Sequence, residues 1–321
     1  MKKALILLLI LSINYSNAQS DSLAVNTKLE QSFPKWKNKN MATLDVSEVA
    51  FVNWNSGGSN SISALLGLVS QANYKFKHFF WNNNINIRYG INKQQSQELR
   101  KTEDLIEINS NIGYRKDSLT NWFFTSRFNF KTQFSNGYTY PNTSNAISKF
   151  MAPGYLFYGV GIEYGKNIEK LSVYFSPATT KSTFVLDQEL ANTGAFGVKP
   201  AELDEQENVI EEGERVRNEF GILFTNAFEA EIAKNIYMKH SVNFYTDYLN
   251  DFGNIDVDWQ VNLDFKVNNY IRANLGSHLK YDNDVKNLVA INDENEEEEF
   301  VEEGAKVQWK QILGIGVVVD F

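Results

Sequence analysis

The chain has 321 residues, 43% of them hydrophobic, no cysteine, and a formal net charge of −8. The apolar content excludes a disordered chain, and the lack of cysteine excludes disulfide frameworks and thiolate metal sites. The longest apolar run, Ala4–Leu11, is far shorter than the ~20 residues of a membrane-spanning helix, which excludes a helical membrane protein. The acidity also argues against nucleic acid as a partner.

The N-terminal segment has the order of a secretory signal peptide. Lys2 and Lys3 precede the apolar run, and the small-residue site Ser16–Ala18 follows it. This order predicts a signal peptide over residues 1–18 that is cut before Gln19. A short buried helix is the alternative interpretation of the same residues.

From Met41 onward the dominant hydrophobic period is two, which indicates β-strands with one apolar and one polar face. In Ile255–Val267 all seven odd positions are apolar and all six even positions are polar. Residues 19–40 lack this alternation, so we interpret them as a periplasmic segment before a folded domain at 41–321. Twelve alternating segments follow in chain order: 42–52, 60–76, 78–92, 103–115, 120–134, 154–165, 169–185, 215–232, 235–250, 254–267, 270–283 and 306–321.

Strand length separates a soluble sandwich from a membrane barrel. Most segments have 12 to 17 residues, whereas strands of globular proteins average ~5–6 and a membrane-crossing strand needs ~9–11. Short turns near residues 77, 117, 167, 234 and 269 alternate with longer loops at 53–59, 93–102, 135–153, 186–214, 251–253 and 284–305. This pattern predicts an all-β fold, a twelve-stranded antiparallel transmembrane β-barrel with short periplasmic turns and longer extracellular loops.

The turns also predict register and a membrane interface. Directly joined strands must present their apolar residues to the same face. Three apolar pairs are therefore expected to oppose each other across turns: Phe76–Phe79, Ile232–Ile236 and Val267–Ile271. Aromatic residues beside the turns are expected to form a periplasmic girdle: Tyr74, Trp81, Tyr114, Trp122, Tyr164 and Phe321.

The last segment alternates to a terminal aromatic residue. Gly316, Val319 and Phe321 resemble the ending by which barrel-assembly machinery receives its outer-membrane substrates, although Gly314 stands where that ending has a polar residue. We therefore expect a bacterial outer-membrane location, with barrel-assembly machinery as a partner during insertion.

Three loop segments resemble a Bacteroidota outer-membrane β-barrel family of unknown function. They are Asn53-Trp54-Asn55-Ser56-Gly57-Gly58, Phe130-Lys131-Thr132-Gln133-Phe134, and Leu186–Ala191 continuing through Gly194–Val198. The resemblance covers most of residues 41–321. It implies a location and an architecture, and it supplies no activity or catalytic residues.

In a membrane barrel the polar face of each strand points inward, because a charge on the lipid face costs ~2–4 kcal/mol at mid-bilayer. Charged side chains of both signs are thus expected in the lumen, where they either pair across a sealed interior or line a wet channel. The candidate lumen-lining residues are Arg88, Arg127, Lys131, Glu219, Lys239, Asp256, Asp258, Asp264, Lys266 and Arg272.

Catalytic chemistry has little support in the sequence. Asp256 and Asp258 would face the same way, as an acid–base or metal pair does, but such a doublet on a polar strand face is seldom catalytic. His240 and Ser241 are adjacent on a strand, so they point to opposite faces and cannot form a dyad. We therefore expect no enzyme activity, no cofactor and no metal site.

The acidic residues are concentrated in two predicted loops. Residues 201–214 hold seven carboxylates and residues 291–303 hold eight. These loops either steer cations to the mouth and bind divalent ions shared with lipopolysaccharide phosphates, or are simply solvated surface.

Two functional hypotheses remain. The first is passive, porin-like transport of small polar solutes through the charged lumen. The alternative is a closed structural or binding barrel that acts through its extracellular loops, notably 135–153, 186–214 and 284–305. Outer-membrane lipid and lipopolysaccharide are the expected surroundings in both cases. The sequence does not define the oligomeric state.

Overall fold

The computed structural model describes residues 35–50, 59–117, 119–165, 170–250, 252–284, 287–292 and 298–321. The expected signal peptide at 1–18 and the segment Asn53–Gly58 lie outside these residues. No helix in the described part of the chain is both long and apolar enough to span a bilayer.

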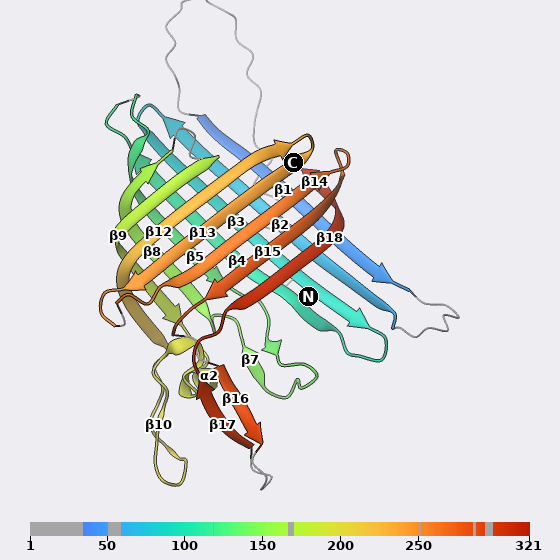
Figure 1. The fold of residues 1–321 in the computed structure, drawn as a ribbon, viewed down its shortest axis with the longest axis vertical. Coiled ribbons are helices and arrows are strands. Elements are labelled where there is room, and N and C mark those ends of the chain that lie inside the picture. The colour runs from blue at the N-terminus through green and yellow to red at the C-terminus, as the bar shows by residue number, and fades with distance from the viewer. Residues whose placement is uncertain are drawn as a thin grey trace, which may run out of the picture. The chain divides into compact units, whose positions relative to one another are not determined.

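Twelve antiparallel strands close into a barrel, as the sequence predicts (Figure 1). Around the barrel the strands follow the order β1-β18-β15-β14-β13-β12-β9-β8-β5-β4-β3-β2, so chain neighbours pair throughout and β1 meets β18. The barrel strands are β1 (Lys35–Val49), β2 (Ser61–Phe76), β3 (Phe79–Gln94), β4 (Arg100–Tyr114), β5 (Trp122–Thr132), β8 (Gly154–Tyr164), β9 (Leu171–Phe184), β12 (Val216–Ala233), β13 (Ile236–Asp247), β14 (Asp256–Lys266), β15 (Ile271–Tyr281) and β18 (Gln308–Asp320).

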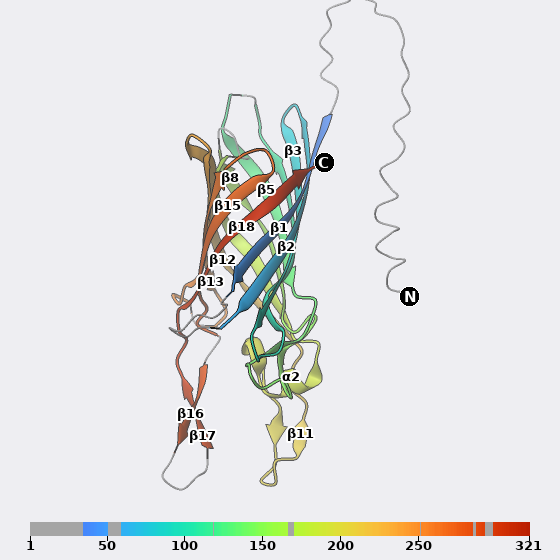
Figure 2. The ribbon, with the colours of Figure 1, turned by 90° about the vertical axis from the view of Figure 1, so that its right-hand side faces the viewer.

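The long connections contain structure that the sequence pattern did not predict. They lie at one end of the barrel, called the loop end, and the short turns lie at the other, the turn end (Figures 1 and 2). The loop-end elements are β6 (Gly137–Tyr138), β7 (Ala146–Ser148), α2 (Gln188–Asn192), η2 (Ala195–Gly197), β10 (Glu202–Leu203), β11 (Val209–Glu211), β16 (Asn287–Asn292) and β17 (Glu298–Glu303).

Two details of the barrel differ from expectation. β1 begins at Lys35, so residues 35–40 belong to the barrel and not to the lead-in segment. This part of β1 has no apolar–polar alternation, because residues 36–39 are exposed on both of its faces, and the sequence pattern therefore did not identify it. Across the turn after β12, Ala233 opposes Ile236, so the expected pairing of Ile232 with Ile236 is wrong. A register irregularity between Glu231 and Ala233 causes this shift.

The other two turn registers are confirmed. Phe76 opposes Phe79 across the first turn, and the Val267 amide donates to the Ile271 carbonyl at 3.0 Å.

Apolar residues on the barrel strands cover its outer surface. The outward positions of β18 show the pattern, with Leu313 71% and Ile315 64% exposed. At the turn end, Trp36 and Trp81 pack with ring centroids 5.6 Å apart, and Trp122 packs on Tyr164 at 5.0 Å. Aromatic residues therefore ring the turn end, where the sequence predicts a girdle.

The barrel is flattened. Twelve strands in a round barrel would enclose roughly 24 Å between opposite backbones, from the strand spacing and usual tilt. Lys131 on β5 nevertheless lies 3.4 Å from Asp258 on β14, and these strands have four others between them on one side and six on the other. Extended Lys and Asp side chains bridge roughly 13 Å between Cα atoms, so the two walls approach. Accordingly, the barrel is broad in Figure 1 and narrow in Figure 2.

Candidate functional site

The inward face of the barrel carries the charged side chains. Of the ten residues proposed to line the lumen, nine form ion pairs, and Lys266 lies exposed at the turn end of β14. Their ion pairs include Arg88–Glu103, Arg127–Glu163, Lys131–Asp258, Glu219–Lys181, Lys239–Glu229, Asp256–Lys181, Asp264–Arg272 and Arg272–Asp45.

Two groups of ion pairs cross the loop half of the lumen. In the first, Lys131 lies between Asp258 at 3.4 Å and Glu107 at 3.6 Å. Asp258 also contacts the His278 ring at 2.9 Å. Because β5 and β14 are on nearly opposite walls, this contact passes through the interior.

The second crossing joins β18 to β4. Lys310 reaches Glu103 at 2.6 Å, with Arg88 3.4 Å from the same carboxylate. The strands β1, β2 and β3 lie between the two partners, so this contact also runs through the lumen. Together the two crossings divide the interior in the loop half of the barrel.

Lys181 gathers carboxylates at the loop-end mouth. Its ammonium lies 2.8 Å from Asp256, 3.4 Å from Glu219 and 3.4 Å from Asp282. Arg217 extends the group, since its guanidinium is 2.8 Å from Asp284. Lys181 is 5% exposed and Glu219 is 2% exposed. Such burial makes the pairing necessary, because an unpaired buried charge is strongly unfavourable.

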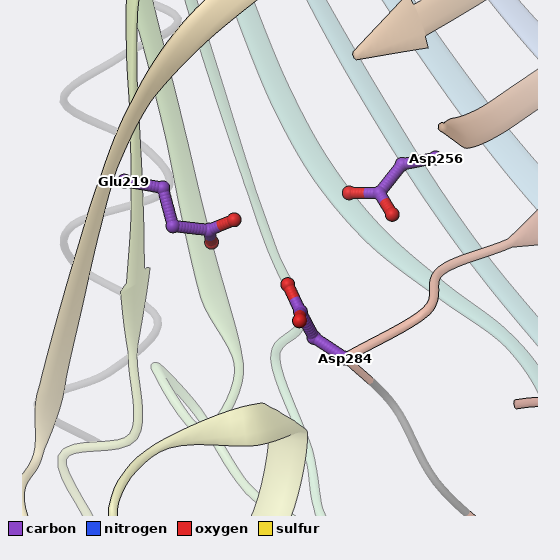
Figure 3. A group of neighbouring side chains, drawn as sticks. All are labelled: Glu219, Asp256 and Asp284. Carbon is purple, nitrogen blue, oxygen red and sulfur yellow. The ribbon is translucent and has the colours of Figure 1, made fainter. Parts of the chain in front are cut away.

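The mouth group is the best candidate for cation binding in the described part of the chain. Glu219, Asp256 and Asp284 each place one oxygen within 4.8 Å of the others (Figure 3). The cations of the chain already satisfy these carboxylates: Lys181 contacts two of them and Arg217 contacts the third. We therefore describe this group as an ion-pair cluster that joins β9, β12 and β14 to the segment after β15.

A buried ion pair stiffens the turn half of the lumen. Arg127 donates to Glu163 at 2.7 Å and to the Ser172 hydroxyl at 2.7 Å. Its guanidinium also lies 4.1 Å from the Tyr174 ring centroid. Glu163 and Tyr174 are both fully buried. This contact links three adjacent strands, β5, β8 and β9.

Beyond this region a polar cavity opens toward the turn end. Its volume is about 240 Å³. Side chains of both charges line it, including Lys170, Glu229 and Lys239. Gln260 and Asn262 from β14 complete its polar wall.

The connection between β9 and β12 folds into a small cap. Val185, Ala191 and Val198 are almost fully buried and form an apolar cluster with Ala152. Arg217 donates to the Gly197 carbonyl at 3.1 Å. This contact ties the cap to the mouth cluster, because the same arginine binds Asp284.

An ion pair fixes α2 within the cap. Asp187 caps the helix by accepting a hydrogen bond from the Leu190 amide at 3.2 Å. Lys149 donates to the same carboxylate at 2.7 Å. This hydrogen bond lowers the pKa of Asp187 and raises the pKa of Lys149. The segment Leu186–Val198, on which part of the family resemblance depends, is therefore a folded element and not an open loop.

Sequence reasoning missed several partners of the predicted residues, notably Lys181, Glu103 and Glu163. The alternation pattern did not assign Lys181 to the lumen because β9 contains a register irregularity. Gly221 opposes Thr179 whereas Leu223 opposes Ser176, so β9 carries one extra residue here. The buried positions of β9 consequently change from even to odd numbers. The change of parity at Pro177 and Ala178 is the signal that would have identified Lys181.

Residues 46–138, less than a third of the chain, match a family described as a protein of unknown function, DUF3078. No curated protein matches the chain.

Similar solved structures include two that cover most of this chain. One is an outer membrane channel from Pseudomonas putida F1, with 9% identity, a TM-score of 0.39, and coverage of 93% of this chain and 100% of that chain. The other is the translocator domain of the autotransporter NalP from Neisseria meningitidis, with 8% identity, a TM-score of 0.32, and coverage of 87% of each chain.

Proposed function

We propose that this protein is an integral outer-membrane β-barrel that is closed at rest and acts through its loop end, without enzymatic activity. The outer surface supports the membrane location. Leu44, Leu66 and Trp259 are each more than 40% exposed on barrel strands, and many similar residues surround them. Soluble proteins rarely expose a continuous apolar belt of this kind, whereas a membrane barrel requires one.

The proposal that the lumen is closed rests on the two ion pairs that cross it, Lys131–Asp258 and Glu103–Lys310. A wide channel would keep Lys131 and Asp258 on separate, hydrated walls, but here they meet across the interior. The Glu103–Lys310 contact repeats the arrangement with different strands. Side chains from opposite walls therefore meet in the loop half, and the cap contacts the mouth cluster through Arg217.

Conductance in planar bilayers tests the closed state. We expect little or no unitary conductance from the purified wild-type protein. The double variant Lys131→Ala/Asp258→Ala removes the nearly diametric contact, so it should conduct measurably more. The matched control is Glu229→Ala/Lys239→Ala, which removes an equally charged pair that joins neighbouring strands at 3.3 Å and is about half exposed. This control should behave like the wild type.

Passive transport of small polar solutes is the second candidate function. The polar cavity of about 240 Å³ at the turn end favours it, because such a vestibule would become part of a pathway if the crossing pairs separate. A steady unitary conductance of the wild-type protein would establish this candidate and contradict the closed state.

The expected partners depend on the membrane location. We propose that lipopolysaccharide surrounds the loop end and that barrel-assembly machinery inserts the chain. The β10–β11 hairpin supports contact with lipopolysaccharide-bound cations, because Glu202 and Glu211 are exposed on it. Their shared partner, Lys199, is also about half exposed, so divalent cations can compete for the carboxylates.

A further inference from the structure

The wall of the barrel is incompletely hydrogen-bonded between its first and last strands. β1 and β18 pair over only six positions, from Met41–Asp320 to Val46–Ile315. β1 pairs with β2 through Val49, and β18 pairs with β15 from Gln308 onward. The loop half of this seam therefore lacks the pairing that each strand makes with its other neighbour.

Within the described residues, positions 311–314 of β18 leave backbone groups without a partner on β1. Asn40 and Phe321 exchange both of their backbone hydrogen bonds. Because antiparallel pairing alternates, the odd residues of β18 point their backbone groups toward β1. Those of Gln311 and Leu313 accordingly face the open part of the seam, opposite residues 50 and 48 in the continued register. Over the described residues, the opening extends roughly 13 Å along β18, from Gln311 to Gly314, at about 3.3 Å per residue.

Exposure on both faces confirms the separation of the two strands. In a closed wall, inward residues are covered, as Thr43 and Asp45 are at 7% and 9% exposure. Beyond them, residues 46–50 of the chain are all exposed, whichever way they point. Residues 308–311 of β18 are likewise all exposed.

The lumen directly behind the opening contains uncharged side chains beside one charged residue, Lys310, whose ammonium extends across the lumen to Glu103. Ser63 and Leu65 on β2 share the inward face with Asp45. From β18, Ile312 and Gly314 are on the same inward face. Outside, Leu313 is 71% exposed and Trp309 is 66% exposed. Apolar side chains thus lie on both the outer and the inner face of β18 at the gap, where Leu313 and Ile312 are neighbours.

We propose that the loop half of the β1–β18 seam is a lateral portal that admits the hydrocarbon chain of a membrane amphiphile from the bilayer into the lumen. The inference rests on the proposed membrane location. Unpaired strand edges are costly in hydrocarbon, at several kcal/mol for each unsatisfied group, so a gap at this depth requires a reason. Access for an apolar chain supplies one, since Leu65 and Ile312 lie directly behind the gap, while Lys310 extends away from it to Glu103 and the ion pairs close the axial route.

Single cysteines test the portal, because the natural chain contains none. Three variants are compared in phosphatidylcholine vesicles: Ile312→Cys, inward behind the gap; Val318→Cys, inward behind the paired seam; and Leu313→Cys, outward. The probe is a long-chain alkyl maleimide dissolved in the bilayer. Circular dichroism and heat-modifiable gel mobility confirm that each variant is folded.

We expect Cys labelling at positions 312 and 313 at similar rates, and on the order of ten-fold slower labelling at 318, where a hydrogen-bonded wall separates the thiol from lipid. Slow labelling at 312 with fast labelling at 313 would overturn the portal while leaving the membrane barrel intact. Slow labelling at 313 as well would contradict the membrane location, and with it both proposals.

Discussion

Lys181 is the side chain that holds the loop-end mouth together. It is the shared partner of Asp256, Glu219 and Asp282, and it is 5% exposed. Replacing it by methionine keeps most of its volume but leaves buried carboxylates without a cation. Because an uncompensated buried charge costs about 3–5 kcal/mol, Lys181→Met should lower the free energy of unfolding by that amount in urea titrations in detergent.

Lys239 provides the matched control for this variant. It also pairs with a glutamate, but both partners are about half exposed. Exposed pairs contribute about 0–1 kcal/mol, so Lys239→Met should change the unfolding midpoint little. Equal losses from the two variants would show that burial of the mouth cluster does not determine its contribution.

The Asp187–Lys149 pair predicts how the cap responds to pH. The pKa of Asp187 is lowered by the hydrogen bond from Lys149, so its contribution is complete above ~pH 4 and is lost as pH falls through the lowered folded value. The pKa of Lys149 is raised, so its contribution is lost only at alkaline pH, above ~10. Hydrogen exchange of the α2 amides should therefore accelerate, beyond the intrinsic pH effect, only at these two extremes.

The variant Asp187→Asn tests whether the carboxylate charge of Asp187 causes this pH response. Asparagine is as good an N-cap as aspartate, so the helix start is retained while the ion pair is lost. This variant should show weaker α2 protection at neutral pH and no additional loss in acid. Retention of the acid transition in the variant would assign that transition to another group.

At the scale of single elements, the barrel strands were largely predictable and the cap was not. Hydrophobic alternation depends on which face meets lipid, and this depends only on local sequence in segments such as Ile255–Val267. The cap depends on contacts between distant residues, such as Lys149 with Asp187. Ion-pair partners were missed for the same reason, because Lys131 and Asp258 are close only once the barrel has closed.

The paired part of the β1–β18 seam depends on a small residue. A β-carbon at Gly316 would lie 2.6 Å from the Leu44 carbonyl oxygen and 2.8 Å from Cα of Asp45. Gly316→Val should therefore force β18 away from β1 and destabilise the closed barrel by about 1–3 kcal/mol, as overpacking does. Refolding into detergent, followed by heat-modifiable gel mobility, measures this without cellular assembly factors.

Gly304 is the control position for this substitution. Within the part of the chain that the structure describes, a β-carbon there has no neighbour closer than 4 Å, so Gly304→Val should refold like the wild type. Normal refolding of Gly316→Val would mean that the seam tolerates separation over its whole length.

At the scale of the whole barrel, flattening and closure are connected. A round twelve-stranded barrel would keep opposite walls too far apart for Lys131 to reach Asp258, roughly 24 Å between backbones against a reach of roughly 13 Å. The contacts that close the lumen consequently exist only because the two walls approach. Strand number alone could not reveal this, since twelve strands are compatible with an open or a filled interior.

Distance measurements between spin labels can test the flattened cross-section. Phe130 and Trp259 point outward beside Lys131 and Asp258, so labels at Phe130→Cys/Trp259→Cys report the short axis. Labels at Leu66→Cys/Phe220→Cys report the long axis, because β2 and β12 are opposite strands in the barrel order. We expect a clearly shorter distance for the first pair, and similar distances for both would indicate a round barrel. The first distance should lengthen in Lys131→Ala/Asp258→Ala if the crossing ion pair holds the walls together, because removing that attraction lets the barrel relax toward a round section.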